Sequence, residues 1–217
     1  PAAAGPVSVA TTYFGNATAD SLAAFPGGFA ARVSVPAANT SVLNGASPDA
    51  STFITGGFAS FNVTDSTGKA IKQFDTPVTV GIDLPVGSLD ANGNAVAPGD
   101  QYPVWSYNDA TGEWVFEKMG TVQTKAGDPL NYSVVFPTNH LSSWNLDIVP
   151  GPSCTARLNL NGRPSGDSRS LVVEVVGTTG RRFFTSATIT DSSVNMYNVP
   201  SVPLNVTVRD PSKSGDR

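Results

Sequence analysis

The residues best able to do chemistry gather near the middle of the chain, around its only histidine. His140 falls in the run Asn-His-Leu-Ser-Ser-Trp-Asn, which covers residues 139–145. Histidine is the side chain most often used as a general base, so this run is the first place to look for catalysis. No strongly diagnostic catalytic motif occurs elsewhere in the sequence. We therefore expect the sequence to indicate the kind of protein more clearly than its partner.

Paired carboxylates also occur, but their contexts do not indicate an enzyme. Asp83 with Asp90 and Glu113 with Glu117 are the examples. Neither pair lies in a context that resembles the acid and base of a glycosidase, which must stand at a defined separation. Glu113 and Glu117 are expected on one strand, so alternation predicts that both point to the same face, toward solvent.

A short loop carries oxygen ligands at the spacing of a calcium site. Asp90, Asn92 and Asn94 stand at positions i, i+2 and i+4. A calcium loop of the EF-hand type needs Gly at its sixth position and Glu at its twelfth. Those positions hold Ala95 and Gln101 here. We therefore predict a turn, with no metal site and no cofactor.

Three tryptophans could form a platform for carbohydrate rings. By strand alternation Trp105 and Tyr107 share one face, and Trp114 and Phe116 share one face of the following strand. Cross-strand aromatic pairs that fix a register and fill a core explain the same pattern, and we favour this interpretation. A sugar-binding face that uses Trp105, Trp114 or Trp144 requires exposed, coplanar rings.

Five Asn-X-Ser/Thr triplets are present, a mild excess over chance for a chain this rich in Ser and Thr. Two interpretations stay open: coincidence, and N-glycosylation of a secreted eukaryotic protein. The candidate glycosylation sites are Asn16, Asn39, Asn62, Asn131 and Asn205.

The single cysteine, Cys154, excludes an internal disulfide and a Cys/His zinc site. We expect it to be a buried, small apolar residue. Alternatively, it pairs with a cysteine of a neighbouring domain if the chain is a piece of a longer protein, which its abrupt start and polar end suggest.

Composition points to a β-rich extracellular protein with many turns. Charged residues make up only 14% of the 217 residues, against roughly 25% in an average soluble domain. Gly (21) and Pro (17) are abundant, and the net charge is −4. Nucleic acid requires a clustered basic face, which this sequence lacks, and membrane headgroups are disfavoured for the same reason. No apolar run of about 18 residues predicts a membrane span.

The elements that must position these residues are strands and turns. Two aromatic strands over 104–107 and 113–122 flank Asn-Asp-Ala-Thr-Gly, which predicts a hairpin, and a third strand over 132–136 leads to the histidine run. Further strands are expected at 7–14, 29–35, 53–64 (bulged at Gly56-Gly57) and 78–84, with a turn at 65–69. The only weak helical pattern covers residues 17–24.

A domain boundary is expected at residues 148–152, where two prolines and a glycine stop any strand. Short strands at 156–160, 171–176, 182–189, 194–199 and 204–208 then predict a small antiparallel sandwich. The fold class we predict is all-β, with two antiparallel β-sandwich domains in tandem, over residues 1–150 and 151–217. The second domain ends in a polar tail.

Four segments carry a resemblance to a known family: GFASFNVTD with TGK at 57–69, PVTVGIDLP at 77–85, PVWSYNDATGEW at 103–114 and HLSSWN at 140–145. Their order and spacing over residues 53–147 resemble the ZU–UPA type of β-sandwich module of bacterial surface proteins and, more distantly, of netrin receptors and ankyrins. Residues 153–208, with MYNVP at 196–200 and LNVTV at 204–208, resemble the carboxypeptidase-regulatory-like (transthyretin-like) sandwich. The Gly-rich second strand of that sandwich is altered in this chain.

The resemblance implies a second chemistry at His140. Some relatives of the first module cut themselves at His-Phe-Ser, and adhesion-receptor GAIN domains cut at His-Leu-Ser/Thr. By that analogy His140 would deprotonate Ser142, whose oxygen would attack the carbonyl of Leu141 and leave an ester for water to hydrolyse. Leucine replaces the phenylalanine of the nearer relatives. The alternative is that His140 and Trp144 cap the last strand and pack in the core.

Taken together, the sequence predicts a non-enzymatic structural, adhesion or assembly module of an extracellular or cell-surface glycoprotein. Its expected partners are other domains or proteins of that assembly, with glycans as a further class, and neither nucleic acid nor an inserted membrane. The alternatives are an autoproteolytic module cleaved between Leu141 and Ser142, and a carbohydrate-binding module.

Overall fold

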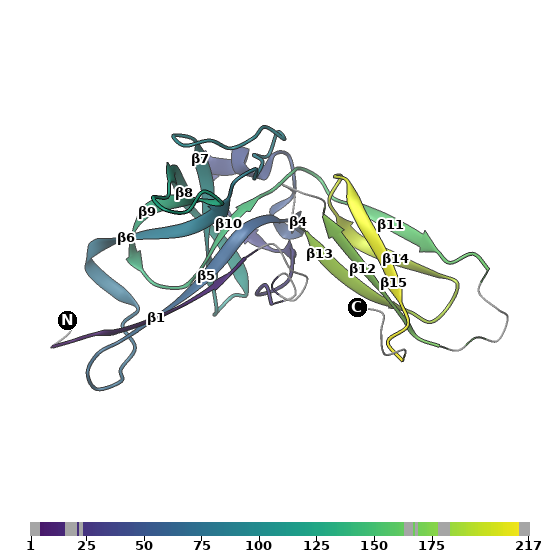
Figure 1. Cartoon of the computed structure of the whole chain (residues 1–217), viewed down its shortest axis with the longest axis horizontal. Helices are drawn as coiled ribbons and strands as arrows, with labels where there is room; N and C mark the ends of the chain where they lie inside the picture. Colours follow the sequence, from purple (N-terminus) through teal and green to yellow (C-terminus); the bar gives the residue numbers. More distant parts are fainter. Residues whose placement is uncertain are drawn as a thin grey trace.

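The chain folds as an all-β protein, as predicted. The computed structural model describes residues 5–15, 21, 24–162, 167, 169–177 and 183–212. Its strands form one large sheet with several small ones, and the pairings are antiparallel except for the short contact between β3 and β8. Figure 1 shows strands β1–β10 gathered in one part of the molecule and β11–β15 in another. No helix of the described residues is long and apolar enough to cross a membrane.

The large sheet has the strand order β1-β5-β10-β7-β8-β9-β6. Its strands are β1 (Ser8–Phe14), β5 (Ile54–Thr64), β6 (Gln73–Pro85), β7 (Gln101–Asn108), β8 (Glu113–Thr124), β9 (Asn131–His140) and β10 (Ser143–Ile148). Six of these strands match stretches that the sequence predicted as strands. The exception is β10, which was not predicted. Only Leu141 and Ser142 separate it from β9, and the sequence shows no glycine or proline there that would mark the start of a new strand.

Short elements lie beside or over this sheet, and one of them, β3, is its eighth strand through its pairing with β8. They are β2 (Ala30–Ala31), β3 (Val33–Ser34), the 3₁₀ helices η1 (Ala37–Leu43) and η2 (Pro48–Ala50), and β4 (Ser51–Thr52). The single strand expected over 29–35 is therefore two pieces, because β2 pairs with β4 whereas β3 pairs with β8. Neither 3₁₀ helix was predicted. Most of the weak helical pattern at 17–24 lies outside the described residues.

The predicted aromatic hairpin is present and fixes the centre of the sheet. Strands β7 and β8 are joined by a turn in which the carbonyl of Asn108 accepts from the amide of Gly112 at 2.8 Å. Trp105 stands opposite Phe116 and Tyr107 opposite Trp114, with ring centroids 5.4 Å and 5.1 Å apart. Such cross-strand pairs stabilise one register over the alternatives, which slip every side chain to the other face.

A β-bulge in this hairpin corrects the expectation for the two glutamates. Trp105 pairs with Phe116 and Val104 with Lys118, so Glu117 is an extra residue in β8. The expected position toward solvent is not observed for Glu113 or Glu117. Their side chains are instead only about a quarter exposed, at 25% and 23%. Glu113 lies 3.3 Å from the guanidinium of Arg32, and Glu117 receives a hydrogen bond from Ser106 at 2.6 Å.

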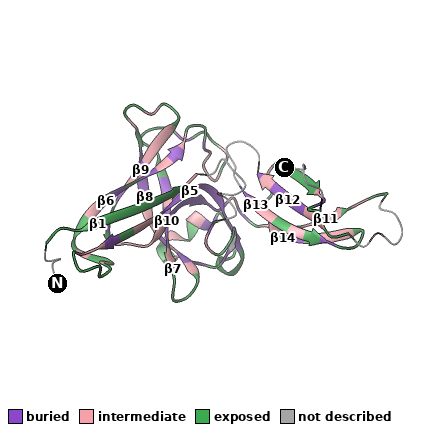
Figure 2. Ribbon diagram, turned by 60° about the horizontal axis from the view of Figure 1, so that its bottom comes forward, coloured by how far each residue is buried: buried purple, intermediate pink, exposed green. Residues whose placement is uncertain are grey.

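Both faces of the large sheet are buried, each by its own apolar cluster. One face packs Ile54, Val80, Ile82, Leu84, Val104, Val122, Val134, Phe136, Trp144 and Leu146. The other face carries an aromatic cluster that we call the joint cluster. It contains Phe25, Phe29, Leu43, Phe53, Phe58, Trp105, Trp114, Phe116 and Val149 from the N-terminal part, and Val173, Val175, Phe183, Ile189, Met196 and Val199 from the C-terminal part. In Figure 2, buried residues (purple) are seen around β5 and β10 in the middle of the large sheet.

The C-terminal strands form a small two-layer arrangement. They are β11 (Cys154–Asn159), β12 (Leu171–Gly177), β13 (Phe184–Ile189), β14 (Ser193–Val199) and β15 (Leu204–Arg209). Strands β11 and β14 pair in one sheet, and β13, β12 and β15 pair in the other. All five lie within two residues of the predicted stretches. Among the described residues, strand pairing does not join β1–β10 to β11–β15.

The two parts nevertheless pack directly on each other through the joint cluster. The rings of Phe29 and Phe183 meet edge to face at 5.7 Å, and the hydroxyl of Thr52 donates to the carbonyl of Asn198 at 2.9 Å. The connection is held as well, because the side-chain amide of Asn44 donates to the carbonyl of Pro150 at 3.1 Å. Val149, just before this proline, is fully buried. The connection is therefore packed against its neighbours rather than surrounded by water.

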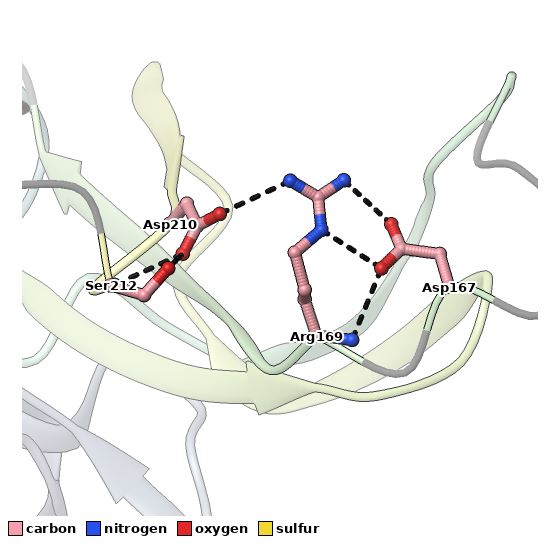
Figure 3. Close-up of polar contacts among 4 residues, drawn as sticks. All are labelled: Asp167, Arg169, Asp210 and Ser212. Carbon is pink, nitrogen blue, oxygen red and sulfur yellow. Dashed lines mark hydrogen bonds and ion pairs between the residues drawn. The ribbon is translucent and has the colours of Figure 1, made fainter.

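Ion pairs fasten the end of the C-terminal part (Figure 3). Arg169 lies between two carboxylates, 2.7 Å from Asp167 and 3.2 Å from Asp210, and the hydroxyl of Ser212 donates to Asp210 at 2.6 Å. The hydrogen bonds and charges of these aspartates raise the pKa of Arg169 above its usual range. The segment before β12 is thereby tied to the segment after β15.

Cys154 is exposed, which contradicts the expectation of a buried position. It begins β11, where most side chains alternate between exposed and half-buried positions. Its thiol donates to the carbonyl of Val199 at 3.3 Å. By alternation Cys154 would share a face with the half-buried Ala156 and Leu158, but the register shifts between Cys154 and Ala156.

At Gly56 the sheet leaves no room for an added methyl group. A Cβ on Gly56 would lie 2.4 Å from Cδ1 of Leu84 and 3.0 Å from the carbonyl oxygen of Leu146. We expect Gly56→Ala to lower the free energy of unfolding by about 1–3 kcal/mol, the usual effect of overpacking. Gly15→Ala is the control, because its Cβ would meet only an ordinary contact at 3.6 Å. Equal denaturant midpoints for the two variants would contradict this account of the sheet.

Candidate functional site

The His-Leu-Ser segment forms the tight connection between β9 and β10. His140 ends β9 and Ser143 begins β10. The amide of Leu141 donates to the carbonyl of Lys72 at 2.9 Å, and the hydroxyl of Ser142 donates to the carbonyl of Tyr107 at 2.6 Å. Both residues between the strands are therefore held by backbone carbonyls of other segments.

The imidazole of His140 faces the bulge residue of β8. Its Nε2 lies 3.1 Å from Oε1 of Glu117, the oxygen that also accepts from Ser106. Its ring lies against Trp144, with centroids 4.9 Å apart. Trp144 belongs to the apolar cluster on the first face of the sheet, so His140 lies beside that cluster.

This arrangement separates the base from the nucleophile that self-cleavage would require. In a nucleophile–base pair the hydroxyl donates to the imidazole, which a third group orients. Here the hydroxyl of Ser142 donates to Tyr107, and His140 meets Glu117. Within the described part of the chain no hydrogen bond joins His140 to Ser142. The geometry agrees with the interpretation in which His140 and Trp144 cap the last strands and pack there.

We expect the purified chain to stay intact between Leu141 and Ser142. The hydroxyl that would attack is committed to a backbone carbonyl, and the base is turned toward a carboxylate. A denaturing gel and an intact mass spectrum of fresh and aged protein check this, with Ser142→Ala as the control. Two fragments in the wild type that are absent from the alanine variant would show that the segment rearranges into a cleaving geometry.

The three tryptophans do not form an exposed platform. Trp105, Trp114 and Trp144 are all 0% exposed. The indole nitrogen of Trp105 donates to the carbonyl of Asp147 at 2.9 Å, and that of Trp114 donates to the carbonyl of Pro26 at 3.2 Å. The exposed, coplanar rings that a sugar-binding face requires are therefore absent at these three positions. They fill the core, as the cross-strand interpretation predicted.

The candidate glycosylation sites differ in accessibility. Asn62 on β5 and Asn205 on β15 are exposed, whereas Asn39 in η1 and Asn131 at the start of β9 are half-buried. The amide nitrogen of Asn131 also donates to Asp128 at 3.0 Å. Asn16 lies outside the described residues. Asn62 and Asn205 are thus the two positions best placed to accept a glycan.

The Asp90 loop is a turn, as predicted. Oδ1 of Asp90 accepts from the amides of Asn92 and Asn94 at 2.9 Å and 2.8 Å, and Oδ2 accepts from the side chain of Asn94 at 3.0 Å. These bonds hold the pKa of Asp90 below its usual value, against the opposing effect of partial burial. Because both carboxylate oxygens already serve the loop, few lone pairs remain for a cation. No group of three or more His, Cys, Asp or Glu that could hold a metal occurs among the described residues.

A shallow groove of about 370 Å³ lies beside this loop. Side-chain amides line part of it, from Asn39, Asn92 and Gln101. The larger side chains of Tyr102 and Met119 also line it. Tyr102 is 2% exposed, and burial raises the pKa of its phenol well above the usual range, with the charge of Asp147 adding to the effect. The groove contains no titratable pair suited to acid–base chemistry.

The most unusual polar group is Asp147, which is fully buried on β10. Its Oδ2 accepts a hydrogen bond from the side chain of Asn145, whose Oδ1 accepts from Thr55 at 3.4 Å. Thr55 in turn accepts from the amide of Gly57 at 2.9 Å. The cluster sits where the pairing of β5 with β10 shifts register, between Leu146 and Asp147. The irregular backbone gives these polar side chains partners that a regular ladder would not supply.

Burial raises the pKa of Asp147 to about 8, and the hydrogen bonds from Asn145 and Thr55 only partly oppose this effect. The carboxyl is then largely protonated at neutral pH, which avoids the large cost of an unpaired buried charge. Because the folded state keeps a proton that the unfolded chain releases above its ordinary pKa of 3.8, stability falls as the pH rises from about 4 to about 8.

We expect Asp147→Asn to remove this pH dependence. The wild type should lose stability across that interval with a slope of up to about 1.4 kcal/mol per pH unit, whereas the variant should show a flatter profile. Denaturant unfolding at pH 5 and pH 8.5 measures both, and Asp49→Asn, at an exposed position, is the control. A wild-type profile that rises toward pH 8 would contradict a buried, protonated Asp147.

No family model, curated protein or solved structure matches the chain. The ZU–UPA and transthyretin-like resemblances accordingly stay predictions that rest on the quoted segments. The groups that sequence reasoning missed are Ser106, Glu117 and the buried set around Asp147. The sequence singled out Glu117 only as a carboxylate four residues after Glu113. No residue type near it predicts the bulge at this position of β8.

Proposed function

We propose that the chain is a non-enzymatic structural module of an extracellular or cell-surface glycoprotein, acting as a stiff spacer for assembly or adhesion. The observation that carries the proposal is the joint cluster, which packs aromatic rings of the N-terminal part against β12, β13 and β14. A spacer must hold its two ends at a fixed separation, and a joint buried in this way resists bending more than a solvated linker does.

Other features support the same role. Charged side chains are few, at 14% of the residues. The exposed Asn62 and Asn205 offer two positions for glycans, which would shield the surface from proteases. The buried tryptophans and the committed Ser142 leave the residues that first suggested chemistry in structural positions.

The stiffness of the joint can be measured directly. Spin labels at Thr79 on β6 and Tyr197 on β14, both exposed, report the distance between the two parts in a Cys154→Ser background. We expect one narrow distance distribution for the otherwise unchanged chain. Phe183→Ala should broaden it, because Phe183 is 1% exposed and its ring contacts Phe29 across the joint.

Phe136→Ala is the matched control. Phe136 is equally buried but belongs to the other cluster, so its loss should lower the free energy of unfolding by about 3–5 kcal/mol without broadening the distribution. A broad distribution in the unmutated chain, or equal broadening in both variants, would contradict the spacer role.

A further inference from the structure

Strand β1 is an exposed edge of the large sheet. Every residue from Ser8 to Tyr13 is exposed, and only Phe14 is half-buried, where its ring stacks on Phe58 at 4.4 Å. Within the described residues β1 pairs with β5 alone, so its second edge presents free amides and carbonyls. Figure 2 shows β1 coloured as exposed along its length at the border of the sheet.

This edge lacks the features that normally prevent strand addition. Natural edge strands are guarded by charges, prolines or bulges. Residues 7–15 of the chain read VSVATTYFG, without charge or proline, and the seven pairs of β1 with β5 run without a register shift. The strand at the other end of the sheet, β6, exposes Asp75 and Pro77 and is therefore guarded.

The exposed apolar side chains of β1 lie on one face. Val9 is 59% exposed and Tyr13 43%, and Val7, just before the strand, is 48% exposed; the hydroxyl of Tyr13 donates to the carbonyl of Asp83 at 3.3 Å. Val9 stands opposite Val63 and Thr11 opposite Phe61, so the odd-numbered side of β1 continues an apolar row of β5 that ends in water. A strand added to β1 would extend this row and use its free backbone groups.

We propose that β1 pairs antiparallel with β1 of a second copy of this chain, with Thr11 on the two-fold axis. In this register Val9 lies opposite Tyr13 of the second copy, and the two Thr11 residues face each other. Aromatic–β-branched and Thr–Thr neighbours are favourable cross-strand pairs. The contact is closed, because each copy uses the same edge and leaves no free edge of this kind for a third.

The absence of charge favours a second copy over a charged partner. An acidic or basic strand would lose hydration at this neutral edge and find no opposite charge on β1, whereas an identical strand brings no charge at all. The inference rests on the proposed assembly role and names a partner for it. Its test is independent of the stiffness of the joint: a stiff monomer would overturn this inference alone, and a flexible dimer would overturn the spacer role alone.

Sedimentation of the full chain over a wide range of concentration tests the pairing. We expect the unmutated chain to move reversibly from monomer to dimer as concentration rises. Thr11→Lys places two like charges at the axis and should leave a monomer. Thr79→Lys, which adds the same charge at an exposed position of β6, should dimerise as the unmutated chain does. Matched melting temperatures show that both variants stay folded.

Disulfide trapping tests the register in a Cys154→Ser background. Thr11→Cys should form a covalent dimer rapidly under mild oxidation, because the two residues oppose each other across the axis. Ser8→Cys should not, because in this register Ser8 stands opposite Phe14 of the second copy. A monomer at all concentrations, a dimer unaffected by Thr11→Lys, or equal trapping at positions 8 and 11 would overturn the inference.

Discussion

The structure depends on the stacking of aromatic side chains over the second face of the large sheet. Phe25 is central to it, because its ring stacks on Phe29 at 4.6 Å and on Trp114 at 5.3 Å and meets the edge of Phe58 at 5.2 Å. These contacts hold the loop before β2 against the sheet. Phe25 thereby covers Trp114, together with Phe53 and Tyr107. Because the same cluster continues to Phe183 and β12, it also decides how the two parts of the chain meet.

Burying both faces of a sheet creates a need for polar partners in the core. Aromatic nitrogens and backbone groups lose water there, and most find acceptors; among the described residues the buried indole nitrogen of Trp144 and Oδ1 of Asp147 have no partner. Asp147, at the irregular pairing of β5 with β10, supplies two of the acceptors. Its carbonyl accepts a hydrogen bond from the indole N–H of Trp105, and its side chain accepts one from the side-chain amide of Asn145. The buried polar cluster and the buried tryptophans are thus two results of one constraint. Burial therefore favours the protonated form of Asp147 over the charged one.

The sequence predicted most strands because their apolar alternation and the turns between them are local signals. The hairpin of β7 and β8 is the best example, with aromatic residues on both strands and Asn-Asp-Ala-Thr-Gly between them. What it could not predict depends on register. The extra residue Glu117 in β8 had no local signal. The bulge predicted at Gly56-Gly57 is present, because Leu146 pairs with Gly57 and Asp147 with Thr55, but the sequence did not show that Asp147 would lie buried opposite it. The exposure of Cys154 also involves register, because the pairing of β11 with β14 shifts between Cys154 and Ala156.

The few charged residues show why the edges of the sheets matter so much in this molecule. Several of its cations lie in pairs with neighbouring carboxylates, as Lys125 does with Asp83 and Asp128, and Arg209 with Glu174. Such half-exposed pairs add little to stability, but they cancel charge locally. The chain keeps a net charge of −4, so an uncharged stretch of its surface offers a partner only short-range contacts. On a protein built from strands, those contacts are the unpaired backbone groups of an edge and the apolar side chains beside them. Asp75 and Pro77 guard β6, and β1 carries no such residue, so the association that we propose would use only one side of the sheet.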